Sequence, residues 1–313
     1  MPVEALNVEA HETVAEGLMF PEGPVVGADG SIYLVEIERG TVSRVGADGG
    51  VSVVADLGGG PNGLAMGPGG DLYVCNCGGF LFERQAGLNH ARPGVPEGYS
   101  GGRIERVDPR TGESRVLYDH CGEHRLVGPN DLAFDRHGGF YFTDLGKIYP
   151  RSRPNGGLYY AKADGSSITE LAYPMITPNG VGLSPDGGTV YVAETETARL
   201  WAFDLESPGE VRRHPFPSPH GGRLVVGFGT YDRFDSLAVD AMGNLCVATL
   251  VSGCISVISP DGRLIRQVGM GDPYTTNICF GGDDMRTAYV TLSGTGRLVR
   301  MRWPEAGLRL PYA

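Results

Sequence analysis

Short apolar segments separated by glycine-rich turns recur along the chain, and one polar residue stands near the start of each repeat. The order of polar residue, apolar segment, Gly-rich or Asp-Gly turn and second apolar segment is typical of a β-hairpin. It occurs six times, as PEGPVVGADGSIYLVE from Pro21, PNGLAMGPGGDLYVCN from Pro61, PNDLAFDRHGGFYFTD from Pro129, PNGVGLSPDGGTVYVAE from Pro178, FDSLAVDAMGNLCVAT from Phe234 and TNICFGGDDMRTAYVT from Thr276. The pattern therefore predicts a protein built from six related units.

A second hairpin follows the first in these units, for example TVSRVGADGGVSVVAD and CISVISPDGRLIRQVG. Each unit thus supplies four antiparallel strands, and the units start roughly 40 to 70 residues apart, as propeller blades with loop insertions do. We predict an all-β fold, a six-bladed β-propeller that occupies residues 1–313 as a single domain. The last unit is one strand short, so the N-terminal segment ETVAEGLMF is expected to complete the last blade and close the ring.

The alternative for repeated strands is a parallel α/β fold, but no helical periodicity of about 10 to 15 residues separates the strands. The 50 glycines and 22 prolines agree instead with many tight turns.

The formal net charge of −11 and the isoelectric point near 5.1 disfavour binding to nucleic-acid phosphates or to an anionic membrane, because like charges repel. The N-terminal residues lack the pattern of a secretory signal, and no stretch reaches the roughly 18 apolar residues of a spanning helix. We expect a soluble cytoplasmic protein that acts on a small molecule. The sequence leaves its oligomeric state open.

The six cysteines are too few for a dense disulfide framework in a chain of this length, and they lack the paired C-x-x-C spacing of a zinc site. They are expected to be reduced thiols. Their positions are Cys75, Cys77, Cys121, Cys246, Cys254 and Cys279.

In a propeller the first strand of each blade lines the channel, so the polar residues of the six repeat starts should converge at one end of it. They are Glu22, Asn62, Asn130, Asn179, Asp235 and Asn277. Pro-Asn-Gly alone is ordinary turn chemistry, but a turn does not require the two carboxylates, and clustered anions need a counter-charge. Carboxylate and amide oxygens without His or Cys suit calcium or magnesium, so the pattern predicts a divalent metal ion.

The motifs FPEGP, GPNDLAF, TPNGVGLSPDG and DSLAVDAMGNLCVA give the chain a resemblance to the SMP-30/gluconolactonase family, related in architecture to diisopropylfluorophosphatase, over nearly its whole length. The resemblance implies a propeller lactonase in which Glu22, Asn179 and Asp235 bind the metal, while Asn130 binds the metal or contacts substrate. The oxygen donors favour calcium as the cofactor, with Zn2+, Mg2+ or Mn2+ as alternatives. The family usually has Pro-Asp-Gly where this chain has Phe-Asp-Ser from Phe234, so the acid is kept but its turn differs.

The predicted reaction is the opening of a small lactone, with Asp235 and Asn130 as catalytic residues. The cation would polarise the carbonyl oxygen while water attacks, and Asp235 would act as general base. Direct attack by Asp235 is a less favoured variant. The same ion would also suit an organophosphate hydrolase, and a third alternative is a non-catalytic binding propeller in which the ion ties the blades together.

Connections between the second and third strands of each blade should overhang this end of the channel. Two of them carry insertions, GGFLFERQAGLNHARPGVPEGYSGG and LGKIYPRSRPNGG. The predicted substrate contacts are Asn62, Arg92, Tyr99, Tyr149 and Arg151. Residues 98–102 match the G-x-S-x-G motif of serine hydrolases, but a Pro/Gly-rich loop is not the strand–turn–helix that this motif requires, so we interpret them as a loop.

Overall fold

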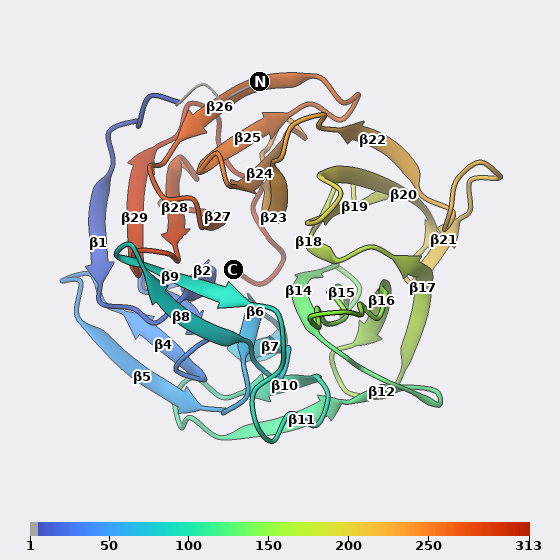
Figure 1. Ribbon diagram of the computed structural model, residues 1–313, viewed down its shortest axis with the longest axis horizontal. Coiled ribbons are helices and arrows are strands. Elements are labelled where there is room, and N and C mark those ends of the chain that lie inside the picture. Colours follow the sequence, from blue (N-terminus) through green and yellow to red (C-terminus); the bar gives the residue numbers. More distant parts are fainter. Residues whose placement is uncertain (1–5) are drawn as a thin grey trace.

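The hairpin repeats form six antiparallel sheets that stand around a central channel, as the computed structural model shows for residues 6–313 (Figure 1). Each sheet has four strands in a row, and the first strand of each lies innermost. The six innermost strands contact one another in cyclic order around the channel. The prediction of a six-bladed β-propeller is therefore confirmed.

The strands of each blade have the following bounds. Blade 1 consists of β2 (Pro21–Val26), β3 (Ile32–Glu36), β4 (Thr41–Val45) and β5 (Val51–Asp56). Blade 2 consists of β6 (Pro61–Met66), β7 (Leu72–Asn76), β10 (Arg103–Val107) and β11 (Ser114–Tyr118). Blade 3 consists of β14 (Pro129–Phe134), β15 (Gly139–Asp144), β16 (Gly156–Lys162) and β17 (Ile168–Met175). Blade 4 consists of β18 (Pro178–Leu183), β19 (Thr189–Glu194), β20 (Arg199–Ser207) and β21 (Glu210–Arg212), and β22 (Arg223–Gly227) also pairs with β20. Blade 5 consists of β23 (Arg233–Val239), β24 (Leu245–Leu250), β25 (Cys254–Ile258) and β26 (Leu264–Gly269). Blade 6 consists of β27 (Thr275–Gly281), β28 (Thr287–Leu292), β29 (Arg297–Arg302) and β1 (Glu12–Glu16).

The N-terminal strand closes the ring. Strand β1 pairs antiparallel with β29, from Glu12 opposite Arg300 to Glu16 opposite Arg297. The last blade is thus assembled from both ends of the chain, and the edge that β29 would otherwise expose is paired. This outcome confirms the prediction made from the missing strand.

Six apolar clusters fill the six interfaces between neighbouring blades. A blade that is covered on both faces needs apolar side chains at successive positions, not only at alternate ones. Strand β15, with the sequence GFYFTD, is buried along its whole length for this reason. The interface between blades 2 and 3 is rich in aromatic rings, including Tyr73 and Phe134, whose centroids lie 4.9 Å apart.

The remaining described segments are loops, one turn of 3-10 helix (Pro68–Gly70) and two small hairpins. One hairpin, β8 (Leu81–Gln85) with β9 (Leu88–Arg92), belongs to the insertion of blade 2, and the other joins β12 (His120–Cys121) to β13 (His124–Arg125) before blade 3. Residues 98–102 lie in a loop, as expected. The six cysteines are free thiols. Among the described residues, no helix has both the length and the apolar character needed to cross a membrane.

Candidate active site

The six polar residues of the repeat starts all lie at the beginning of an innermost strand, and all are buried, with 2 to 9% of their surface exposed. The register of each innermost strand shifts at this point, where a β-bulge or irregularity interrupts its pairing with the second strand. A bulge changes the direction in which the adjacent side chains point. The same irregularity, repeated in all six blades, therefore marks one end of the channel.

Glycine follows the polar residue in blades 1, 2 and 4, where neighbouring innermost strands approach closely. A Cβ atom on Gly63 would lie 2.3 Å from the carbonyl oxygen of Asn130, and one on Gly180 would lie 2.6 Å from that of Asp235. These contacts are with backbone, which cannot swing aside. The glycines thus allow the strands that carry the site to pack against one another.

Replacing Gly180 by alanine is therefore expected to force β18 and β23 apart and to lower the free energy of unfolding by about 1 to 3 kcal/mol, as overpacking does. Thermal or denaturant unfolding would measure the loss. The matched control is Gly229→Ala, because a Cβ there meets no atom within 4 Å. Equal stability of the two variants would contradict the close approach of these strands.

The two carboxylates of the set interact with each other across the channel. Burial, the charge of Asp235 and the charge of Asp131 raise the pKa of Glu22 well above its usual range, although hydrogen bonds from Asn277 and Gly23 partly offset them. Burial, together with the charge of Asp131, raises the pKa of Asp235 to about 7. Holding both buried groups ionised is costly without a cation.

The amides of the set differ in how they are held. The Nδ2 of Asn277 donates to the Oε2 of Glu22 (2.8 Å), and the Nδ2 of Asn179 donates to the hydroxyl of Thr195 (3.0 Å). Asn130 is 2% exposed, and its Oδ1 is buried without a hydrogen-bond partner among the described residues. A buried acceptor without a partner carries a desolvation cost, and a cation or a substrate hydroxyl would relieve it.

Asp131 is a third buried carboxylate, whose charge acts on both Glu22 and Asp235, and sequence reasoning missed it. Its carboxylate accepts hydrogen bonds from the amides of Leu132 (2.9 Å) and, across the blade boundary, Val181 (3.4 Å). Burial raises its pKa to about 7. The signal was present in the repeats, because the position after the polar residue is Gly, Gly, Asp, Gly, Ser and Ile in blades 1 to 6.

The donor set fits a hard divalent cation. Carboxylate and amide oxygens are the ligands that calcium and magnesium prefer, and Glu22, Asp235 and the unpartnered Oδ1 of Asn130 supply them. No three His, Cys, Asp or Glu side chains of residues 6–313 gather into a metal-binding cluster. A site here would therefore depend on amide oxygens as well as on carboxylates.

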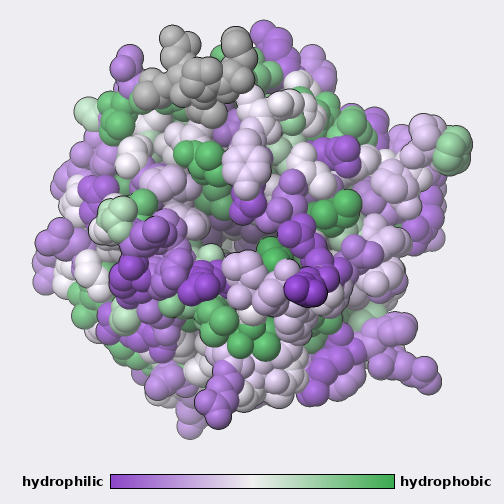
Figure 2. Space-filling view, in the orientation of Figure 1, coloured by the Kyte–Doolittle hydropathy of each residue, from purple (hydrophilic) through white to green (hydrophobic). Residues whose placement is uncertain are grey.

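The β8–β9 hairpin reaches from blade 2 over the same end of the channel to blades 1 and 6 (Figure 1). The backbone amide of Asn89 donates to the carbonyl of Gly294 in blade 6 (2.8 Å), and its side chain donates to Glu38 in blade 1 (2.8 Å). His90 is hydrogen-bonded to the hydroxyl of Tyr274 (3.1 Å). Figure 2 shows a hollow near the centre of this face, with hydrophilic side chains on its rim.

The predicted substrate contacts lie in different surroundings. Asn62 is buried at the start of β6. Arg92 is exposed on β9, where it pairs with Glu83 (2.8 Å), and the hydroxyl of the half-buried Tyr99 donates to the carbonyl of Val127 (2.5 Å). Both side chains are thus already engaged by protein groups.

Tyr149 and Arg151 lie in the insertion of blade 3, where Tyr149 is partly buried and Arg151 is exposed. The same loop carries Lys147, which is 1% exposed and donates to the carbonyl of Gly79 (2.7 Å). Its ammonium also lies 4.4 Å from the centroid of the Phe80 ring. Lys147 thus joins the insertions of blades 2 and 3.

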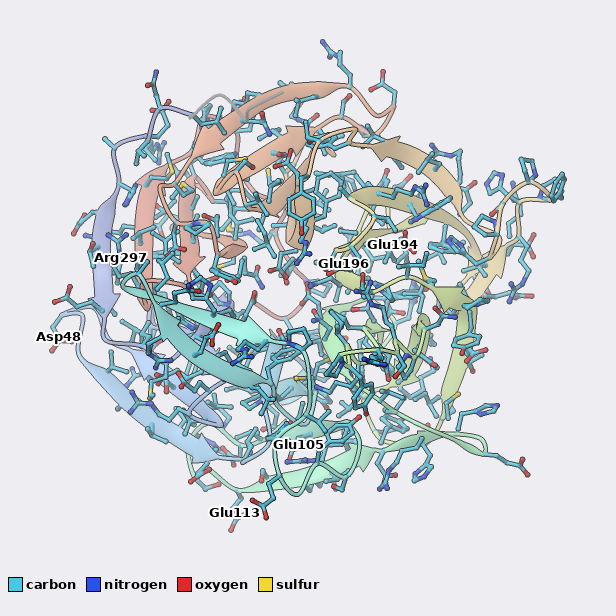
Figure 3. All side chains as sticks on the ribbon, viewed as in Figure 1. Asp48, Glu105, Glu113, Glu194, Glu196 and Arg297 are labelled. Atoms are coloured by element: carbon cyan, nitrogen blue, oxygen red, sulfur yellow. The ribbon has the colours of Figure 1, made fainter. Side chains whose placement is uncertain are left out.

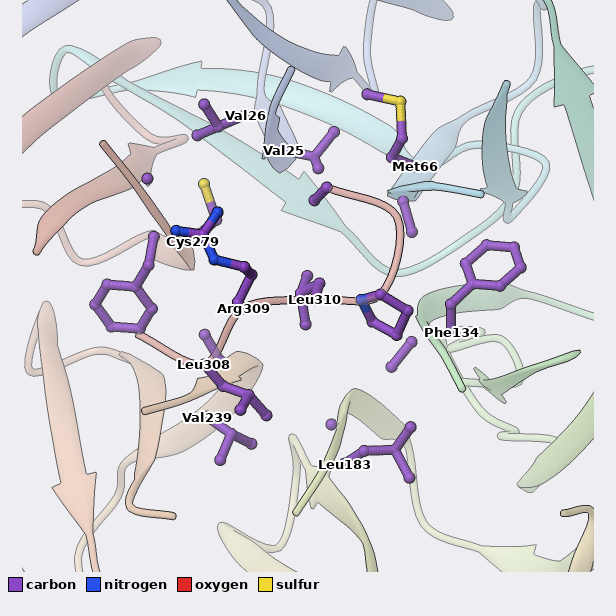
Figure 4. A pocket seen from close by; sticks show the side chains of 18 of the residues that line it. Val25, Val26, Met66, Phe134, Leu183, Val239, Cys279, Leu308, Arg309 and Leu310 are labelled. Atoms are coloured by element: carbon purple, nitrogen blue, oxygen red, sulfur yellow. The ribbon is translucent and has the colours of Figure 1, made fainter. Parts of the chain in front are cut away.

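The opposite end of the channel widens into a cavity of about 770 Å3 lined largely by apolar side chains (Figure 4). The C-terminal residues cross it: the amide of Leu308 donates to the carbonyl of Val239 (2.9 Å) in blade 5, and the Tyr312 ring packs edge-on against Phe134 (5.3 Å) in blade 3. The buried carboxylates and amides, which could bind a cation or exchange a proton, lie at the other end, so we place the candidate active site there.

The sequence is similar to proteins of known class over nearly all of its length. The SMP-30/gluconolactonase/LRE-like family model matches residues 20–294. The chain is 26% identical to a gluconolactonase of Zymomonas mobilis, with 95% of this chain and 82% of that protein covered. It is 29% identical to the lactonase drp35 of Staphylococcus haemolyticus, with 82% and 70% covered. The fold is similar to that of a calcium-binding protein, regucalcin from Agrobacterium tumefaciens, with a TM-score of 0.72, 19% identity and coverage of 96% and 98%. The family match includes all six strands that carry the channel residues.

Proposed function

Because the chain belongs to the SMP-30/gluconolactonase/LRE-like family, we propose that it is a lactonase that opens a small lactone ring, such as that of a sugar acid. The observation that carries this proposal is the group of buried carboxylate and amide oxygens at the hairpin end of the channel. The similarity to a gluconolactonase and to the lactonase drp35 supports the reaction class.

In this proposal four residues hold a divalent cation, most suitably calcium: Glu22, Asn130, Asn179 and Asp235. The cation would supply Lewis acidity toward the lactone carbonyl. The two carboxylates match its charge, and the free Oδ1 of Asn130 gains a partner. Regucalcin, whose fold is similar, is a calcium-binding protein.

Asp235 is the proposed general base. Its carboxylate takes a proton from water while the water oxygen forms a bond to the lactone carbonyl carbon. The bond between that carbon and the ring oxygen then breaks, and the ring oxygen leaves as an alcohol after receiving the proton that Asp235 took from water. Glu22 suits this role less well, because its Oε2 already accepts hydrogen bonds from Gly23 (2.7 Å) and Asn277 (2.8 Å) and it is only 2% exposed.

Substrate would reach the site from the face covered by the β8–β9 hairpin. Asn62 and Asn130 lie near the starts of the neighbouring innermost strands β6 and β14. Their amide groups could form hydrogen bonds with the hydroxyls of a sugar lactone. Tyr149 and Arg151 remain proposed contacts on the blade 3 insertion. Arg92 and Tyr99 would have to leave their present partners, Glu83 and Val127, in order to contact substrate.

Removal of the metal tests the proposal. A chelated, desalted preparation is expected to open a panel of aldonolactones, including D-glucono-1,5-lactone, about 100-fold or more slowly, the order lost with one oxyanion-stabilising group. Calcium should restore the rate. The measurement is proton release in weak buffer, corrected for spontaneous hydrolysis. Unchanged rates in chelated protein would contradict metal dependence, and phosphotriester cleavage without lactone opening would favour the organophosphate alternative.

A further inference from the structure

The last residue of the second strand is polar and almost completely buried in blades 1 to 4. These residues, which we call loop clamps, are Glu36, Asn76, Asp144 and Glu194, and they are 0 to 3% exposed. Each stands directly opposite the proline that precedes the channel residue of its own blade, in the pairs Pro21–Glu36, Pro61–Asn76, Pro129–Asp144 and Pro178–Glu194. The same pairing in four blades indicates a repeated structural feature.

Each loop clamp accepts a backbone hydrogen bond from the loop that leads into the first strand of its blade. Glu36 accepts from Met19 (2.8 Å), Asn76 from Gly60 (2.9 Å), Asp144 from Val127 and Gly128 (2.7 Å each), and Glu194 from Ile176 (2.8 Å). These donors lie two or three residues before the channel residue. Proline has no N–H for the β-ladder, so a side-chain acceptor holds the backbone where the ladder cannot.

The clamps are themselves fixed by further buried contacts. Glu36 also accepts from the hydroxyl of Ser43 (2.6 Å), and Glu194 from that of Thr197 (2.7 Å). Asn76 donates to Glu105 (2.8 Å). Figure 3 shows Glu194 in blade 4, where it ends the second strand β19.

Blade 5 has no loop clamp, so a clamp is not required for a blade of this propeller to form. Phe234 replaces the proline there, and Thr249 opposite it donates to the carbonyl of Val247 in its own strand. A four-stranded blade with a channel residue thus forms without a clamp. The clamps accompany proline and the channel residue that follows it.

We propose that Glu36, Asp144 and Glu194 are positioning residues that set the metal affinity of the channel site by fixing the loops before Glu22, Asn130 and Asn179. This inference rests on the proposed metal site. Asn76 fixes the loop before Asn62 in the same way, but Asn62 is not one of the proposed metal ligands. The chain therefore contains its own control, because loosening the blade 2 loop should not alter metal binding.

The test compares Glu194→Ala with Asn76→Ala, using calorimetric titration of calcium into the chelated full-length protein. Glu194→Ala is expected to weaken calcium binding about 10- to 100-fold, the usual cost of losing a partner that orients a ligand. Glu194→Gln keeps an acceptor oxygen and should recover most of the affinity. The calcium dissociation constant of Asn76→Ala should lie within about twofold of that of the wild-type protein. This difference between the variants should hold even if both alanine variants lose thermal stability.

Amide hydrogen exchange gives a second readout that does not need the metal. Glu194→Ala should speed exchange in the loop containing Ile176, and Asn76→Ala in the loop containing Gly60, each without effect on the other loop. Unchanged local exchange would overturn the clamp inference, as would equal calcium affinities of the two alanine variants. Absence of calcium binding by the unchanged protein would instead overturn the proposed metal site and with it the affinity role of the clamps.

Discussion

Asp235→Asn is expected to lower kcat for lactone opening by about 10²- to 10⁴-fold, the usual contribution of a general base. The amide keeps the size of the side chain but cannot take a proton from the attacking water. Because Asp235 is buried beside Glu22 and Asp131, removing its charge also relieves repulsion between carboxylates, so the propeller should stay folded. Steady-state kinetics with the lactone panel and a thermal melt measure both effects.

The control for this variant is Asp186→Asn. Asp186 is an exposed turn residue between β18 and β19, at the opposite end of the innermost strand from the site, and its carboxylate accepts hydrogen bonds from Ser184 (2.6 Å) and Gly188 (3.0 Å). Its replacement should leave kcat unchanged. If Asp235→Asn retained full turnover and altered only stability, Asp235 would not be the general base, and the ion would serve to tie blades together.

Ala15→Asp is expected to release the N-terminal strand from the last blade. Ala15 is 5% exposed and packs in the cluster between blades 6 and 1, opposite Leu298 and near Leu34. The side chains of this cluster are apolar, and an unpaired buried charge costs about 3 kcal/mol or more. A lower unfolding temperature is expected, together with self-association through the exposed edge of β29.

Differential scanning calorimetry and light scattering would measure these two effects. Glu12→Gln is the matched control on the same strand, because the Glu12 side chain is exposed and forms a surface ion pair with Arg300 (2.7 Å). That variant should melt close to the unchanged protein. If Ala15→Asp melted there too, strand β1 would not be what closes the ring.

The repeat pattern predicted the blades correctly because each hairpin is a local structure. The turn residues and the apolar segments on either side lie within one short stretch, for example from Pro178 to Glu194, so their pairing can be inferred without knowledge of the rest of the chain. Closure by β1 was also predictable, since the last repeat lacked one strand.

The candidate site was only partly predictable. The six repeat starts identified residues that lie at one end of the channel, including Glu22 and Asp235, whose charges interact. Asp131 was missed because we considered a single polar position in each repeat, whereas the bulge in β14 changes the pairing around the position that follows as well. The loop clamps were missed because their partners are backbone amides, which every sequence contains.

The amino-acid sequence by itself determined the number of blades, the order of their strands and the channel position of the polar residues, because these follow from short-range periodicity and turn chemistry. Only the tertiary structure decided which of those side chains interact, which amide lacks a partner and where the β8–β9 hairpin docks. Asn89 contacts Gly294, and Glu22 contacts Asn277, across more than half of the chain. Such contacts depend on how the ring closes, and no local pattern records them.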